Sequence, residues 1–156
     1  MDIRERVAEL FAKSGVDFSP HVHEPVTSYE TAALVRERFG LTGTETKSLF
    51  LRRKSGGYAM FISIEGQRLD TGRARAALGE KVSLASGDEL QSVTGCVPGC
   101  AVPFGLPPEV SLLVDDSLLS EARLIFSPGP PTETIEVGAE EWAVLMSNAA
   151  NPVLKY

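Results

Sequence analysis

The chain has 156 residues, 43% of them hydrophobic and 7% aromatic, and its 15 Lys and Arg against 21 Asp and Glu give a formal net charge of -6. This length and composition are typical of one globular domain with an ordinary core, so we expect residues 1–156 to form a single domain. The acidic balance argues against a protein that coats nucleic acid, because that binding depends on many Lys and Arg contacts to phosphates. Any nucleic-acid contact should be small and local.

No sequence feature points to a membrane or to export. No run approaches the roughly 18 to 20 apolar residues that cross a bilayer. The opening stretch MDIRERVAELFAKSG carries charges where a secretory signal would be apolar. We therefore expect a cytoplasmic protein without membrane contacts.

Apolar spacing and turn residues predict the elements of the first half. Apolar residues recur at helical spacing through 3–11 and are followed by a glycine, which is typical of an amphipathic helix. A short strand is expected within 16–25. Thr27 and Glu30 form a plausible capping box for a second helix, which Gly40 would end.

The middle of the chain reads as a hairpin followed by short elements. KSLFLRR and YAMFISI are strand-like, and the intervening KSGG supplies turn glycines. The remaining expected elements are a helix at 70–79, a strand at 81–85, a capped helix at 86–93, strands at 109–116, 122–127 and 132–137, and a helix at 139–149. Strands and helices mix without a regular βαβ period, so we expect an α+β fold with a mixed, mostly antiparallel sheet and flanking helices.

The common catalytic signatures are absent: the sequence has no phosphate-binding P-loop, no G-x-S-x-G elbow, no H-E-x-x-H helix and no paired C-x-x-C set. The stretch TGCVPGCAVPFGL at 94–106 is the most unusual segment, because it holds both cysteines of the chain. It reads as a metal or redox pair, as a tight buried turn, or as a loop whose main chain does chemistry. A closed metal site needs about four ligands, and we expect neither a metal nor a cofactor here.

Two further features are ambiguous when taken alone. Lys47 opens a strand after a polar loop, where a lysine is usually a solvated surface residue. Gly99 and Pro103 form G-x-x-x-P, which by itself suits a buried loop. Glycine and proline nevertheless mark places where main chain can approach a ligand.

Together these features resemble the YbaK and prolyl-tRNA synthetase-associated editing domain family. The resemblance rests on Lys47 at the start of a hairpin, LD…ALG, the PGCAVPFG block, a strand that ends in an acidic residue, and SPG before a last strand and helix. It runs from about HVHEP to the final helix, with the motifs in the family's order and separation.

The resemblance implies an aminoacyl-tRNA deacylase that acts in trans. Such an enzyme hydrolyses the ester between a small wrong amino acid and the terminal adenosine of a tRNA, often the tRNA for proline. The implied partners are the acceptor end of an aminoacyl-tRNA and an aminoacyl-tRNA synthetase. In this reading the main chain from Gly99 to Pro103 holds the aminoacyl group and the attacking water, and Lys47 positions the terminal adenosine and favours developing charge.

The resemblance also implies a set of substrate-binding residues. Ser48 follows the family lysine where some relatives carry asparagine, and His23 stands where relatives place an aromatic residue or histidine. Many relatives carry a histidine at the position of Ser127, so its absence weakens any assignment to alanine. The full implied set is His23, Ser48, Cys100, Ala101, Val102, Phe104, Gly105, Ser127 and Gly129. Cys96 and Cys100 are then expected to be small fillers of the loop.

Two alternatives to a deacylase stay open. The same fold could bind aminoacyl-adenosine or serve as a synthetase accessory without turnover, or Cys96 and Cys100 could form a redox or metal pair. Basic residues could form a local patch for the tRNA end, namely Lys47, Arg52, Arg53, Lys54, Arg73 and Arg75. The run 52–54 also fits a solvated hairpin end, and that reading is preferred.

Overall fold

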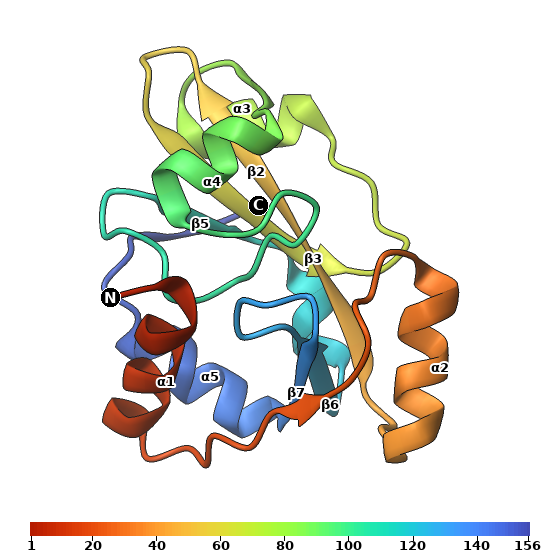
Figure 1. The fold of residues 1–156 in the computed structure, drawn as a ribbon. Coiled ribbons are helices and arrows are strands. Elements are labelled where there is room, and N and C mark those ends of the chain that lie inside the picture. Colours follow the sequence, from red (N-terminus) through yellow and green to blue (C-terminus); the bar gives the residue numbers. More distant parts are fainter.

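The computed structural model describes all residues from 1 to 156, and its helices are interspersed among its strands along the chain (Figure 1). The helices are α1 (Ile3–Ser14), α2 (Tyr29–Phe39), α3 (Thr71–Leu78), α4 (Gly87–Thr94) and α5 (Ala139–Asn148). The strands are β1 (His21–Val22), β2 (Thr44–Arg53), β3 (Tyr58–Ile64), β4 (Val82–Leu84), β5 (Ser111–Val114), β6 (Arg123–Phe126), β7 (Glu133–Gly138) and β8 (Val153–Lys155). None of the helices combines the length and the apolar character of a bilayer span.

The strands form one sheet in the order β1-β7-β6-β2-β3-β5-β8, with β4 also paired to β2. The pairs β1–β7, β2–β3, β2–β4 and β6–β7 are antiparallel, and the other three are parallel. The predicted α+β class with a mixed, mostly antiparallel sheet is therefore confirmed. The long strand β2 is central, because β3 covers one edge while β6 and β4 cover the two ends of the other.

Local signals form most of these elements. The predicted hairpin is β2 and β3, with residues 54–57 as its turn. Four of the helices end at a glycine in the left-handed conformation, whose N–H bonds to a carbonyl of the last helical turn. The helix predicted at 86–93 begins with a capping box between Ser86 and Glu89.

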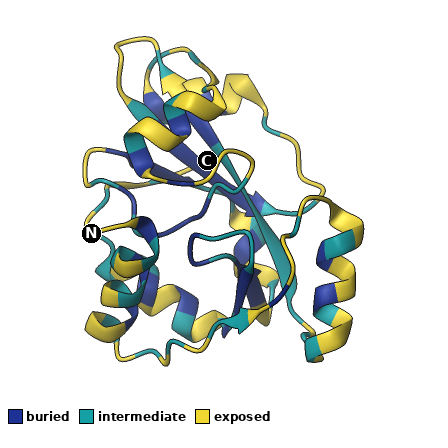
Figure 2. Cartoon of the chain, viewed as in Figure 1, coloured by how far each residue is buried: buried dark blue, intermediate teal, exposed yellow.

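Hydrophobic residues form two clusters on either side of the central strands. The larger one has 20 buried residues and includes α1, α5 and an aromatic group in which the Phe104 ring lies 5.4 Å from Phe126 and 4.9 Å from Trp142. The smaller one has 6 buried residues and packs Leu51 and Phe61 beneath α3. Figure 2 shows the central strands mostly buried and the outer faces of the helices exposed.

Three expectations from the sequence were wrong or incomplete. The N-cap of α2 is Ser28, whose hydroxyl accepts from the N–H of Thr31 at 3.2 Å, and not Thr27. The strand β8 was missed, because its three residues show no strand pattern and gain their partners only through parallel pairing with β5. A short 3-10 helix at Asp116–Ser120 was also missed.

Candidate active site

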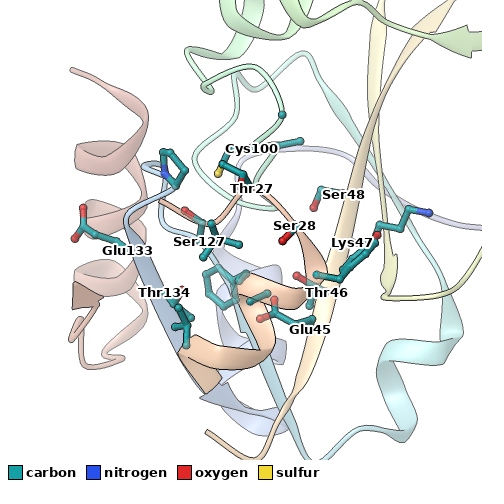
Figure 3. Close-up of a pocket in the computed structure, with 18 of the residues that line it drawn as sticks. Thr27, Ser28, Glu45, Thr46, Lys47, Ser48, Cys100, Ser127, Glu133 and Thr134 are labelled. Atoms are coloured by element: carbon teal, nitrogen blue, oxygen red, sulfur yellow. The ribbon is translucent and has the colours of Figure 1, made fainter. Parts of the chain in front are cut away.

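A pocket of about 540 Å³ lies between β2, the start of α2, and the segments that follow α4 and β6 (Figure 3). This volume lies in the range of small-ligand sites. Its lining comes from residues 26–35, 45–49, 99–103, 126–127 and 131–134. Segments that are far apart in the sequence therefore meet here, including the strand with Lys47 and the G-x-x-x-P loop.

The wall made by the G-x-x-x-P loop presents main chain. Gly99 adopts φ +86°, a left-handed conformation that favours glycine, and no atom would contact a Cβ placed there. The N–H of Cys100 donates to the carbonyl of Val97 at 2.8 Å, which closes the turn. The N–H groups of Gly99 and Ala101 make no hydrogen bond within the chain, and both residues line the pocket. They are free donors for a ligand oxygen.

Helix α1 holds both ends of this loop. The Arg6 guanidinium donates to the carbonyl of Thr94 at 2.6 Å and to the carbonyl of Gly105 at 2.7 Å. Gly105 adopts φ +78°, and a Cβ there would lie 2.8 Å from Val7 Cγ2 and 3.2 Å from the carbonyl of Ile3. Close packing against α1 therefore requires glycine at 105, and Arg6 fixes the loop from both sides.

The turn after β6 forms the neighbouring part of this wall. The Ser127 hydroxyl donates to the carbonyl of Pro130 at 2.7 Å and accepts from the N–H of Gly129 at 3.1 Å. The Cys100 thiol donates to the carbonyl of Gly129 at 3.4 Å. Ser127 thus shapes the turn with its hydroxyl while lining the pocket, and Cys100 joins the turn to the loop.

The two cysteines have structural surroundings. Both are free thiols; Cys96 is fully buried in the larger core cluster and Cys100 is partly buried at the pocket. Burial raises the pKa of both thiols, so they stay protonated near neutral pH and are weak nucleophiles. No three His, Cys, Asp or Glu side chains come together in an arrangement that could hold a metal ion.

The opposite wall includes an open stretch of β2. The carbonyl of Glu45 accepts from the N–H of Glu65 at 2.9 Å, so the odd-numbered residues of β2 turn their main-chain groups toward β3. The main-chain N–H and C=O groups of the even-numbered residues face the other edge of β2. That edge is paired with β6 up to Glu45 and with β4 from Leu51. Ser48 lies in the gap between these two strands, where its main chain is available to a ligand in the pocket.

Lys47 lines the pocket with part of its side chain, but its ammonium group points out of it. The Nζ atom donates to the carbonyl of Gln67 at 3.0 Å, and Figure 3 shows the side chain extending away from the other labelled residues. This hydrogen bond is exposed. Rotation of the flexible lysine stem would be needed to bring the ammonium over the loop.

Several residues of the implied set lie behind the wall. His23 is buried, with Nε2 2.8 Å from the Thr134 hydroxyl and Nδ1 2.6 Å from the carbonyl of Glu24. The implied residues that do not line the pocket are His23, Val102, Phe104, Gly105 and Gly129. Those that line it are Lys47, Ser48, Gly99, Cys100, Ala101, Pro103 and Ser127.

The sequence did not single out the α2 side of the pocket or its carboxylates. Thr27, Ser28 and Tyr29 line the pocket where α2 begins, and Glu45 and Glu133 line it from the sheet. Glu133 accepts from Arg4 with both carboxylate oxygens, at 2.8 to 3.0 Å. No local pattern predicts these residues, because their shared surface arises from contacts between distant segments.

The basic run at the hairpin end is largely neutralised by ion pairs. Arg52 pairs with Glu89, and Arg53 pairs with Glu80 at 3.1 Å. Arg73 lies 4.1 Å from the Tyr156 ring centroid. These arginines therefore already have partners within the chain.

Known proteins resemble this chain along most of its length. The protein-family model described as an aminoacyl-tRNA editing domain matches residues 23–145. The chain is 30% identical over 118 residues to the multifunctional Ser/Thr-tRNA deacylase ProXp-y of Escherichia coli strain K12, a match that covers 73% of this chain and 70% of that protein.

Solved structures share the fold. The crystal structure of hypothetical protein APE2540 has a TM-score of 0.79 and 24% identity, covering 95% of this chain and 96% of that one. A candidate trans-editing enzyme for prolyl tRNA synthetase has a TM-score of 0.76 and 22% identity, covering 100% and 98% of the two chains. At these identities the likeness shows the fold alone. The family match and the curated relative show that this chain belongs to the aminoacyl-tRNA editing domain family.

Proposed function

We propose that this chain is a trans-editing deacylase, a hydrolase that cleaves the ester between a small wrong amino acid and the terminal adenosine of tRNA. The observation that carries the proposal is that the G-x-x-x-P loop and the Lys47 strand, a third of the chain apart, line one pocket. Family membership and the deacylase activity of the Escherichia coli relative support it. The whole chain, residues 1–156, is proposed as one cytoplasmic editing domain.

The proposed chemistry needs a positioned water and a place for negative charge on the ester oxygen. The free N–H groups of Gly99 and Ala101 are suited to stabilise that oxygen, because fixed main-chain donors do not have to reorganise during the reaction. The Cys100 thiol is not the nucleophile, since burial raises its pKa. Water is the attacking group in this proposal, as in the family.

Lys47 is proposed to bind the adenosine end of the substrate. On binding, its Nζ atom leaves the carbonyl of Gln67 and turns toward a phosphate or ribose oxygen. The cost is small, because the hydrogen bond that is lost is exposed to solvent. The remaining substrate-binding roles are proposed for Ser48, Ser127 and the loop from Cys100 to Pro103. His23, Phe104, Gly105 and Gly129 are proposed to support these residues from behind.

A deacylation screen tests the proposal. The purified chain is incubated with tRNAs charged with each of a panel of amino acids, starting with seryl, threonyl, alanyl and cysteinyl esters of the tRNA for proline. We expect hydrolysis of a small subset. Lys47→Ala should lower the rate by about 100-fold or more, the size of a lost charge-stabilising donor. Lys54→Ala, on the same hairpin, is the control. Absence of hydrolysis across the full panel contradicts the proposal.

The orientation of Lys47 favours one second candidate, a module that binds aminoacyl-adenosine without turnover. A lysine that stays on the carbonyl of Gln67 would leave the pocket without a cation. Binding of an aminoacyl-adenosine analogue without ester hydrolysis would select this function. A synthetase partner stays a prediction under both functions, and a pull-down with prolyl-tRNA synthetase tests it.

A further inference from the structure

We infer that Glu45 binds the α-ammonium group of the aminoacyl substrate and restricts the pocket to esters with a free amino group. The inference rests on the proposed function, because it names the part of the substrate that this wall of the pocket reads. Glu45 stands on β2, two residues before Lys47. In Figure 3 its carboxylate points into the group of labelled pocket side chains, whereas the Lys47 ammonium points out of it.

Glu45 is the one pocket carboxylate with an oxygen left for a ligand. The acidic residues that line the pocket are Glu45 and Glu133. Arg4 occupies both oxygens of Glu133. In Glu45, Oε1 accepts from Arg36 Nη1 at 3.2 Å, and Oε2 has no hydrogen bond within the chain. Only one side-chain N or O atom in the chain is both fully buried and without a hydrogen-bond partner, and that atom is Ser117 Oγ. Since Oε2 of Glu45 also has no partner, it is not fully buried and is accessible to solvent.

The surroundings of Glu45 leave it short of positive charge. Its side chain is 19% exposed, and Arg36, which does not line the pocket, supports it from α2. The same Arg36 nitrogen lies 4.0 Å from Glu65 Oε2, so one guanidinium serves two carboxylates. Burial raises the pKa of the Glu45 carboxyl, and the Glu65 charge adds to this. A cation that entered the pocket would relieve both effects.

The proposed substrate supplies such a cation beside the scissile bond. An α-amino group has a pKa near 8, so an aminoacyl ester carries mostly an α-ammonium at neutral pH. An ammonium–carboxylate hydrogen bond in a partly buried site is among the strong ones. A peptidyl or N-acetylated ester has no such charge, so its binding would leave the Glu45 carboxylate desolvated and unpaired. Glu45 would thus protect peptidyl-tRNA from hydrolysis.

Binding of non-hydrolysable probes tests this inference. The probes are 3′-serylamino-3′-deoxyadenosine, which has an amide in place of the ester, and its 3-hydroxypropanoyl counterpart, which lacks only the amino group. An alanyl and propanoyl pair serves as a second set. We expect the wild-type chain to bind each amino probe at least roughly tenfold more tightly than its counterpart, as for one charge-assisted hydrogen bond.

Glu45→Gln should reduce this preference to within about threefold, because the amide keeps the shape but loses the charge. Glu37→Gln is the matched control: it removes an exposed carboxylate of α2 that neither lines the pocket nor pairs with Arg36, and it should keep the wild-type preference. The melting temperature of each variant reports folding. A wild-type chain with no preference, an unchanged preference in Glu45→Gln, or no binding of either probe set overturns the inference.

Hydrolysis separates this inference from the proposed function. Seryl-tRNA and N-acetylseryl-tRNA are compared for wild type and Glu45→Gln, and we expect wild type to hydrolyse only the former. If wild type hydrolyses no ester of the full amino-acid panel while it still prefers the amino probes, the deacylase proposal fails and the role of Glu45 stands. If wild type hydrolyses both esters at equal rates, the role of Glu45 fails and the deacylase proposal stands.

Discussion

The two walls of the pocket present different chemical groups. The loop at 95–105 and the turn after β6 contribute mostly main chain and small side chains, held in place by α1. The wall from β2 and α2 contributes charged and hydroxyl side chains, among them Glu45, Lys47 and Ser48. Under the proposed function, the loop wall would orient the reacting ester, and the wall from β2 and α2 would bind the two ends of the substrate.

The loop wall depends on a helix outside the region that the family model matches. That region begins at residue 23, whereas α1 ends at Ser14. Arg6 nevertheless bonds to the carbonyls at both ends of the loop, Thr94 and Gly105. In this chain α1 therefore supports one wall of the candidate active site, although its sequence reads as scaffold.

The largest expected effect comes from a substitution that disrupts the packing of the loop against α1. Gly105→Ala should lower the free energy of unfolding by about 2 to 4 kcal/mol, because it adds left-handed backbone strain to a clash with Val7 and Ile3. Gly99→Ala is the matched control, since its backbone is equally left-handed but a Cβ meets no atom; about 1 to 2 kcal/mol is expected. Urea denaturation of both variants measures the difference, and equal losses would contradict the account.

Removing the Arg6 guanidinium, which bonds to both ends of the loop, should have the next largest effect. Arg6→Met should cost about 2 kcal/mol of stability, because hydrogen bonds from a charged donor to the Thr94 and Gly105 carbonyls are lost. Deacylation should fall by roughly tenfold at temperatures where the variant stays folded, since the loop donors lose their position. Arg6→Lys should restore part of the rate. Lys13→Met, which changes an exposed cation on α1, should leave the rate unchanged.

The cysteines separate core packing from pocket chemistry. Cys96→Ser should cost about 1 kcal/mol, because it places a hydroxyl in the core. Cys100→Ser should be nearly neutral, since serine can also donate to the carbonyl of Gly129. Thermal unfolding measures both, and the double variant should keep deacylation within about twofold. A large loss of deacylation in a folded Cys100→Ser variant would instead indicate thiol chemistry.

The smallest expected effect concerns the charge of the wall from β2 and α2. Burial raises the pKa of Glu45 in the folded chain, so its ionisation costs stability above that pKa. Glu45→Gln should therefore raise the melting temperature by about 1 to 2 °C near pH 7. The gain should vanish near about pH 3, below the ordinary Glu pKa, where the carboxyl is protonated in both states. A fall of several degrees near pH 7 would show that the Arg36 pair stabilises the fold.

Local sequence signals predicted the parts of this molecule better than their assembly. The hairpin, the capped helix at Ser86 and the glycine helix ends follow from neighbouring residues, and so were predictable. The main-chain wall was predictable because glycine and proline mark it directly. The role of Glu45 was not predictable, because it depends on its contact with Arg36 in the folded chain. The role of Arg6 was not predictable either, because the carbonyls that it bonds to lie more than 80 positions away.

The most direct test of the account is a map of where an aminoacyl-adenosine binds. The ¹⁵N-labelled chain is titrated with 3′-serylamino-3′-deoxyadenosine, and the amide resonances are followed by NMR. The account predicts that the largest shifts occur at Gly99, Ala101 and Ser48, the main-chain groups that line the pocket without partners from neighbouring strands. Shifts confined to other surfaces, such as the apolar groove between Val114 and Met146, would contradict it.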